Sequence, residues 1–176
     1  MNLHIRPESA DDRQAISDLT QRAFQHAPHA SHTEHLIVDA LRQADVLSVS
    51  LVATRDDEDE IVGHVALSPI MLSSAPPGSA AATGWYGLGP ISVSPECQGQ
   101  GIGSQLMQAA LQHLEKAEAS GCVLLGDPAF YSRFGFRPRD ELVLPGVPPE
   151  YFQAIRLRGA WPRGIVSFHP AFDISV

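Results

Sequence analysis

A glycine-rich turn near the middle of the chain holds the residues whose types and spacing most directly predict chemistry. Glycine occupies every second position of the segment Gln98-Gly99-Gln100-Gly101-Ile102-Gly103-Ser104. This segment follows an apolar run and precedes apolar residues at helical spacing, which places it at the start of a helix. The first amides of a helix have no partner within it and lie at the positive end of its dipole, so they suit a phosphate. Glycines leave room for a pyrophosphate at those amides; the alternative is a flexible turn that happens to be rich in glycine.

The spacing of the glycines narrows the kind of phosphate compound that would bind. A dinucleotide-binding turn has the pattern G-x-G-x-x-G, usually with an acid at the end of the next strand, and a mononucleotide P-loop ends in Gly-Lys followed by Ser or Thr. This chain has G-x-G-x-G and no P-loop, and its next apolar run ends at Leu125-Gly126 with Asp127 directly after it. An NAD-dependent oxidoreductase is therefore disfavoured, although Asp127 keeps that alternative open.

Two strands and a helix must position this turn. Apolar periodicity predicts a strand at 85–93, a helix at 101–119 that a left-handed Gly121 would end, and a short buried strand at 122–125. Because strand, helix and strand follow in this order, the two strands should be parallel and joined by a right-handed crossover. Gly89-Pro90 interrupts the first strand, which predicts a bulge or an unpaired edge there.

The rest of the chain supplies further short elements. Periodicity predicts helices that begin near residues 11 and 33, and strands at 3–6, 47–54, 61–71, 152–157 and 165–168. The predicted fold is a mixed α/β arrangement in which antiparallel N-terminal strands join the parallel pair. With 176 residues, a single domain over 1–176 is expected.

Composition excludes several classes of protein. The formal charge of −8 argues against a nucleic-acid-binding face. Two cysteines are too few for a disulfide scaffold, and no apolar run reaches the length of a membrane span. Four histidines recur every three residues from His26 to His35, but Pro28 interrupts any helix through them, so no metal site is expected. We expect a soluble cytoplasmic protein, monomeric or homodimeric.

The pattern Gln98-x-x-Gly101-x-Gly103 resembles the signature of the GNAT acetyltransferase superfamily, in which Arg or Gln precedes x-x-G-x and then Gly or Ala. In that superfamily the turn holds the pyrophosphate of coenzyme A. Residues 89–95 resemble the strand that lies alongside pantetheine, and residues 126–136 closely resemble a bacterial YhbS-like branch. The resemblance implies the fold predicted above and acetyl-CoA as cosubstrate. It also implies a set of coenzyme-binding residues that comprises Ile91, Ser92, Val93, the turn from Gln98 to Ser104, Phe130, Tyr131 and Arg133.

The reaction implied by this resemblance is attack of an amine on the thioester of acetyl-CoA. An oxyanion then forms and needs a hydrogen-bond donor, and the departing thiolate benefits from an acid. The resemblance points to a backbone amide of the 85–93 strand as the donor. Pro90 has no amide proton, so Ile91 is the candidate. It also points to a tyrosine after the second parallel strand as the acid, which selects Tyr131. The alternative is that Tyr131 packs as one more aromatic beside Phe130, while Phe130 lines the core or the acyl pocket.

The general base is the open question of the sequence. The strand before the turn offers Trp85 and Tyr86, where some family members carry a glutamate. Glu34, in a region that borders the acceptor site in the superfamily, is the best candidate, although it is also an ordinary first-turn acid. His64 is a candidate for relaying a proton through water, with a hydrogen-bonded strand histidine as the favoured alternative. The acceptor is predicted to be a small-molecule amine; a peptide amine, or a CoA-binding sensor without turnover, remain alternatives.

Overall fold

A computed structural model describes residues 2–55, 58–73 and 84–175 of the chain. The chain forms two compact units. The first comprises residues 1–68, 89–113 and 170–176, and the second comprises residues 69–88 and 114–169. Strand β5 (Trp85–Val93) and helix α3 (Ile102–Lys116) run from one unit into the other. The expectation of one domain over 1–176 stays a prediction.

The first unit is built on antiparallel strands. Strand β1 (Leu3–Pro7) pairs with β2 (Val49–Arg55), which pairs with β3 (Glu58–Pro69). The Val residues at 52 and 65 and the Leu residues at 51 and 67 are almost fully buried, as expected for strands covered on both faces. The β3 neighbour on the far side from β2 is β5, and the Ser94 amide donates to the Val62 carbonyl at 2.8 Å.

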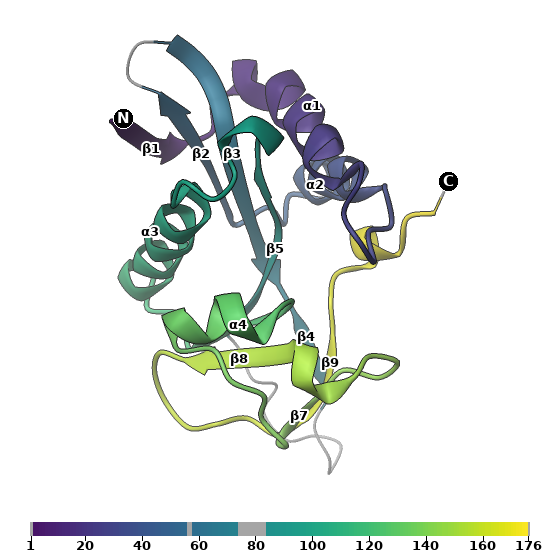
Figure 1. Ribbon diagram of the computed structural model, residues 1–176. Coiled ribbons are helices and arrows are strands. Elements are labelled where there is room, and N and C mark those ends of the chain that lie inside the picture. The colour runs from purple at the N-terminus through teal and green to yellow at the C-terminus, as the bar shows by residue number, and fades with distance from the viewer. Residues whose placement is uncertain (1, 56–57, 74–83, 176) are drawn as a thin grey trace. The chain divides into compact units, whose positions relative to one another are not determined.

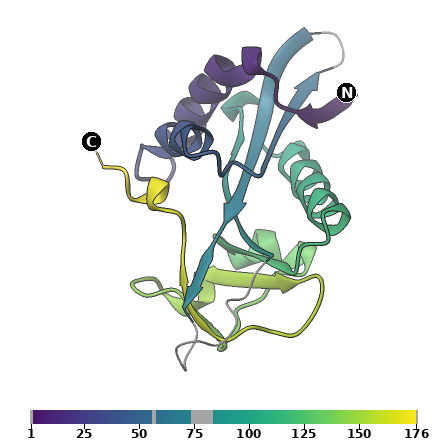
Figure 2. The same ribbon diagram turned by 180° about the vertical axis from the view of Figure 1, so that it is seen from behind.

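Helices cover both faces of β2 and β3 in the first unit (Figures 1 and 2). On one face, α1 (Arg13–Phe24) and α2 (Glu34–Gln43) pack Ile16, Leu19 and Val38 against Val52. On the other face lies α3, which approaches β3 closely at Gly63. A Cβ atom at Gly63 would lie 2.8 Å from Leu106 Cδ1, so the missing side chain permits this approach. The 3₁₀ helix η5 (Pro170–Asp173) buries Ala171 against α2.

The second unit contains strands from two sheets, of six and three strands. In one, β5 pairs in parallel with β6 (Gly121–Leu125) over Trp85–Gly87, and β6 pairs antiparallel with β8 (Phe152–Arg156). The other contains β4 (Met71–Ser73), β9 (Gly164–Ser167) and β7 (Leu142–Val143), in that order. Short helices α4 (Pro128–Tyr131), η3 (Ser132–Phe134) and η4 (Pro149–Tyr151) connect them. The two sheets share a core that includes Trp85, Val123, Leu142, Phe152, Ala154 and Val166.

The predicted parallel strand pair and the mixed α/β fold are confirmed, while some boundaries were wrong. The strand expected at 61–71 ends at Pro69, and Met71 begins the separate strand β4, which pairs with β9. The helix expected to reach residue 119 ends at Lys116. Gly121 is not its cap, because Glu118 has the positive φ of 58° and Gly121 begins β6. A Cβ atom at Gly121 would collide with the Trp85 ring, so this glycine is required by packing.

No helix in the described part of the chain is long and apolar enough to cross a membrane.

Candidate active site

The glycine turn has an open backbone conformation. It follows the 3₁₀ helix η2 (Pro95–Cys97), and α3 begins at Ile102. Gly99 and Gly101 have φ values of +75° and +83°, which residues other than glycine rarely adopt. A Cβ atom at either residue would have nothing within 4 Å, so the space above both glycines is open. The Gly101 carbonyl accepts from the Gln105 amide at 3.1 Å, and the amides from Ile102 onward are the first of the helix.

Two glutamine side chains hold this turn in shape. Gln98 Nε2 donates to the Val93 carbonyl at 3.2 Å, and Gln100 Nε2 donates to the Glu96 carbonyl at 3.2 Å. Both side chains therefore bond to the backbone of the segment that precedes the turn. Ile102 differs from them, because its side chain is buried beside Gly63 and only its backbone amide remains for a ligand. Gly103 and Ser104 are half-buried in the first turn of α3.

The end of β5 offers outward-directed backbone groups. Successive residues of a strand direct their amides to alternate sides. Since the Ser94 amide bonds to β3, those of Ile91 and Val93 point away from β3. The Val93 carbonyl, on that outward side, is the one that Gln98 binds. Ser92 directs its backbone toward β3, and its side chain is buried with no hydrogen-bond partner for Oγ among the described residues. Ile91 and Val93 are therefore better placed than Ser92 to donate to a ligand.

Tyr131 lies in the second unit at the end of α4, the short helix that follows the parallel strand β6 in the sequence. Asp127 caps this helix by accepting from the Ala129 amide at 2.9 Å. The ring of Tyr131 packs edge-on against Phe130, with 4.9 Å between ring centroids, and 6.4 Å from Phe136. Burial, together with the negative charge of Asp127, raises the pKa of Tyr131 to about 12. Tyr131 is thus both an aromatic packing residue and a phenol that keeps its proton at neutral pH.

Gly126 is a residue whose role sequence reasoning missed. A Cβ atom at this position would overlap the Tyr131 ring. The Gly126 amide donates to the Tyr151 carbonyl at 3.0 Å, and its carbonyl accepts from Gln153 Nε2 at 3.1 Å. The placement of Tyr131 therefore depends on the absence of a side chain at 126. A glycine directly after a buried strand was the available signal, but sequence alone does not identify which ring needs the space.

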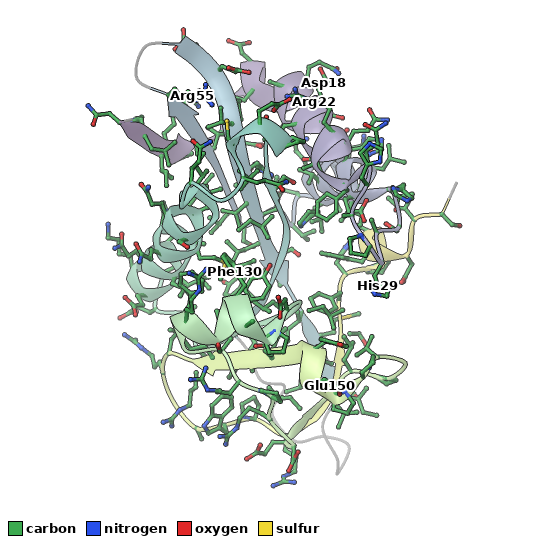
Figure 3. All side chains as sticks on the ribbon, viewed as in Figure 1. Asp18, Arg22, His29, Arg55, Phe130 and Glu150 are labelled. Atoms are coloured by element: carbon green, nitrogen blue, oxygen red, sulfur yellow. The ribbon has the colours of Figure 1, made fainter. Side chains whose placement is uncertain are left out.

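Arg133 and Phe130 form a second feature of this region (Figure 3 labels Phe130). The Arg133 guanidinium carbon lies 4.7 Å from the centroid of the Phe130 ring, and its Nε donates to the Phe130 carbonyl at 3.3 Å. Arg133 is exposed. Its charge is therefore held in place by cation–π stacking while its outer nitrogens face solvent.

Glu34 begins α2 beside a cavity in the first unit. Its Oε1 accepts from the Ser31 amide at 2.8 Å, as a first-turn acid does. Its Oε2 is buried and has no hydrogen-bond partner in the described part of the chain. The adjoining cavity has a volume of about 370 Å³ and is lined by Glu34, by His32, and by Gln21, Arg22, Phe24 and Gln25 of α1. Glu34 thus has one oxygen committed to the local backbone and one without such a commitment.

His64 lies in a buried polar chain on β3. Ser50 Oγ donates to Glu8 Oε2 at 2.6 Å and lies 2.8 Å from His64 Nε2. Because the hydroxyl proton goes to Glu8, Nε2 must carry the hydrogen that Ser50 accepts. Arg42 binds both oxygens of Glu8, at 3.0 and 2.9 Å. Burial lowers the pKa of His64 to about 4, against the opposing charge of Glu8. His64 is a neutral, hydrogen-bonded strand histidine at pH 7.

The remaining reactive side chains are held within the fold. Cys97 and Cys122 are free and buried, and burial raises the pKa of the Cys122 thiol. Arg55 Nη2 donates to Cys97 Sγ. Among residues 2–55, 58–73 and 84–175, no three His, Cys, Asp or Glu side chains come together as metal ligands.

A family model described as an acetyltransferase (GNAT) domain matches residues 47–138, just over half of the chain. The chain belongs to the GNAT acetyltransferase family. It is 37% identical to the N-acetyltransferase YhbS of Escherichia coli K12 over 132 aligned residues. This alignment covers 75% of this chain and 72% of YhbS. It is also 28% identical over 135 residues to the N-acetyltransferase YjhQ of the same strain, 77% of this chain and 68% of that protein.

Two solved structures resemble this one over nearly its full length. A GNAT family acetyltransferase of Brucella melitensis in complex with acetyl-CoA has a TM-score of 0.82 and 42% identity, covering 98% of this chain and 99% of that one. YhbS of Escherichia coli in complex with CoA has a TM-score of 0.85 and 32% identity, covering 99% of this chain and 93% of that one. The predicted family and its YhbS-like branch are thereby confirmed.

Proposed function

We propose that the protein transfers an acetyl group from acetyl-CoA to a primary amine of a small molecule by direct attack. The observation that carries this proposal is the open glycine turn at the start of α3, whose first amides have no helical partner. The relatives whose structures hold acetyl-CoA or CoA support the choice of cosubstrate. The amides from Ile102 to Ser104 bind the pyrophosphate, and Ile91 and Val93 hydrogen-bond the pantetheine arm.

In the proposed reaction, the amine nitrogen bonds to the thioester carbon and the carbon–sulfur bond then breaks. The backbone amide of Ile91 stabilises the intermediate oxyanion. The ammonium form of the amine gives one proton to the base before it attacks, and the nitrogen of the adduct then gives up a second proton. The sulfur leaves as a thiolate and gains one proton to give free CoA. The products are the amide, CoA and one proton released to solvent.

The raised pKa of Tyr131 refines its expected role. A thiol has a pKa of about 8.5, so a phenol with a pKa of about 12 holds its proton more tightly than the departing sulfur does. Complete transfer from Tyr131 to the thiolate would therefore be uphill. Tyr131 instead donates a hydrogen bond that strengthens as the sulfur gains charge, and solvent supplies the thiol proton.

Glu34 is the proposed base for the amine, whose pKa of about 10.4 leaves it protonated in solution at neutral pH. The uncommitted Oε2 and the adjoining cavity support this role. His64 is a weaker candidate, because it is completely buried and its pKa of about 4 makes it a poor proton acceptor. The cytoplasmic location, the oligomeric state and the lack of a resident metal stay predictions.

The test is release of free thiol from acetyl-CoA in the presence of a panel of small amines and, separately, of lysine-containing peptides. Thiol release that depends on a small amine, with the acetylated amine found by mass spectrometry, is the expected result. Release with peptides alone would identify a peptide acetyltransferase. Tight acetyl-CoA binding with no release for any amine would favour a sensor, which the absence of a carboxylate at Trp85 and Tyr86 keeps as an alternative.

A further inference from the structure

Three arginines line a small cavity in the second unit, whose lining includes none of the residues assigned to acetyl transfer. The cavity has a volume of about 210 Å³, and Arg137, Arg139, Arg156 and Trp161 line it. One strand and the Trp161 ring bring them together. Arg137 and Ala154 exchange two backbone hydrogen bonds, at 3.0 and 2.8 Å, and Arg156 follows Ala154 by two residues in β8, so the side chains of Arg137 and Arg156 share one face. Arg139 lies outside any strand, and its guanidinium meets that of Arg156 at the Trp161 ring.

The positive charge at this cavity is only partly compensated. Arg139 Nη2 pairs with Glu141 Oε1 at 3.0 Å. Arg137 Nη1 donates to the carbonyls of Ser132 and Phe136, and Arg156 Nη1 donates to the carbonyl of Gly159 at 2.9 Å. Neither Arg137 nor Arg156 contacts a carboxylate within the described residues. A chain with a formal charge of −8 thus concentrates uncompensated positive charge at one cavity.

Two of the three guanidinium groups lie over the indole of Trp161. The guanidinium carbon of Arg139 lies 4.1 Å from the Trp161 ring centroid, and that of Arg156 lies 5.8 Å from it. Trp161 itself packs against Trp85, with 5.8 Å between centroids. Stacking occupies the faces of the guanidinium planes and leaves their N–H edges available. Arg139 Nε is buried and has no hydrogen-bond partner among the described residues, which is a cost that a bound acceptor would remove.

We propose that this cavity binds the phosphate monoester group of a small molecule. A phosphate dianion matches the charge that Arg137 and Arg156 leave uncompensated, and its oxygens accept from several guanidinium edges at once. The volume accommodates a phosphate group together with its first attached atoms. The phosphate belongs either to a separate phosphorylated metabolite or to the 3′-phosphate of CoA.

Calorimetric titration with inorganic phosphate, at an ionic strength held constant with potassium chloride, tests this site without any acetyl transfer. The wild-type protein should bind phosphate saturably, and Gly101→Glu, which blocks the glycine turn, should leave the binding at this cavity in place. Arg156→Gln and Arg137→Gln should each weaken binding by roughly tenfold or more, because each removes a charge-assisted donor. Both residues are exposed, so the variants should fold. Arg158→Gln is the matched control, since Arg158 is also exposed and pairs with Glu118 at 3.1 Å outside the cavity.

Absence of saturable phosphate binding to the wild-type protein would overturn the proposal, and so would an equal loss of affinity in Arg158→Gln, which would indicate general charge attraction. A comparison of CoA with 3′-dephospho-CoA then identifies the source of the phosphate. If the wild-type preference for CoA disappears in Arg156→Gln, the cavity holds the 3′-phosphate. If the preference is unchanged while inorganic phosphate binding is lost, the cavity holds a separate phosphorylated molecule.

Discussion

The aromatic ring of Tyr131 fills the space in which a side chain at Gly126 would begin. A Cβ atom at Gly126 would overlap Cε2 of that ring and lie 2.9 Å from Cδ2. The Gly126 backbone is held on both sides, by Tyr151 and by Gln153, so it does not move away freely. Gly126 is therefore a positioning residue for Tyr131, and its φ is not in the range that demands glycine. The space that Gly126 leaves for the Tyr131 ring can be tested by adding a Cβ atom at residue 126.

Gly126→Ala should lower turnover by roughly tenfold or more, because displacement of a reacting group by about 1 Å costs up to a hundredfold. The double variant with Tyr131→Phe separates positioning from general damage. If Gly126 acts through the Tyr131 hydroxyl, Gly126→Ala should cause little further loss of kcat in the Tyr131→Phe background. Independent, additive losses in this cycle would show that Gly126 matters for another reason. Circular dichroism and thermal unfolding check that each variant folds.

Tyr131→Phe should fold normally, bind acetyl-CoA with similar affinity and lose roughly a hundredfold in kcat, the low end of the range for removing one hydrogen-bond donor to a developing anion. The substitution keeps the ring contacts with Phe130 and Phe136 and removes one hydroxyl. Because the pKa of Tyr131 is raised to about 12, the wild-type rate should show no loss from its ionisation up to pH 10. A variant within twofold of wild-type kcat, where chemistry limits the rate, would return Tyr131 to a packing role.

The parts of the site that sequence predicted are those encoded locally. A strand, a glycine turn and an amphipathic helix are contiguous, so the turn from Gln98 to Ser104 was located correctly, as were the bounds of β5 at Trp85–Val93. The second sheet was not predicted as such. The strand expected at 165–168 corresponds to β9, but its neighbours β7 and β4 have two and three residues, which is too few to show a period. Pairings between distant residues, such as Arg137 with Ala154, leave no local signal either.

Gly101→Glu should abolish acetyl-CoA binding, because the new carboxylate would occupy and repel the phosphate position. Gly146→Glu is a matched control. Gly101 and Gly146 have φ values of +83° and +84°, both are exposed, and a Cβ atom at either meets nothing within 4 Å. Both variants should therefore lose similar stability from backbone strain, about 1–2 kcal/mol. Calorimetry should find acetyl-CoA binding lost only in Gly101→Glu; equal affinity in the two variants would refute the phosphate role of the turn.

Glu34→Gln should lower turnover with the amine and alter the acidic limb of the pH–rate profile, if Glu34 accepts the amine proton. The amide oxygen of glutamine can still accept from the Ser31 amide, so the start of α2 should survive. An unchanged kcat and an unchanged acidic limb would mean that the base lies elsewhere or that the amine arrives neutral.

His64 should make the protein less stable as the pH falls from 7 toward 4. The unfolded chain binds a proton at this histidine below about pH 6.5, whereas the folded chain resists protonation until the pKa of about 4. Stability from this source is therefore full above about pH 6.5 and is lost progressively down to pH 4, by about 3 kcal/mol in the free energy of unfolding. The lowered pKa of Glu8 acts in the same direction at the acidic end of this range.

His64→Gln should flatten this dependence, because glutamine does not titrate and its side-chain amide can still donate to Ser50 Oγ. Urea unfolding at pH 7, 5.5 and 4.5 measures the free energy of both proteins. All other histidines are common to the two chains, so the difference between their slopes isolates residue 64. We expect the wild-type advantage over His64→Gln to shrink or reverse as the pH falls. Parallel curves would mean that His64 titrates in the folded protein much as it does in the unfolded chain, which would contradict its burial in the Ser50–Glu8–Arg42 network.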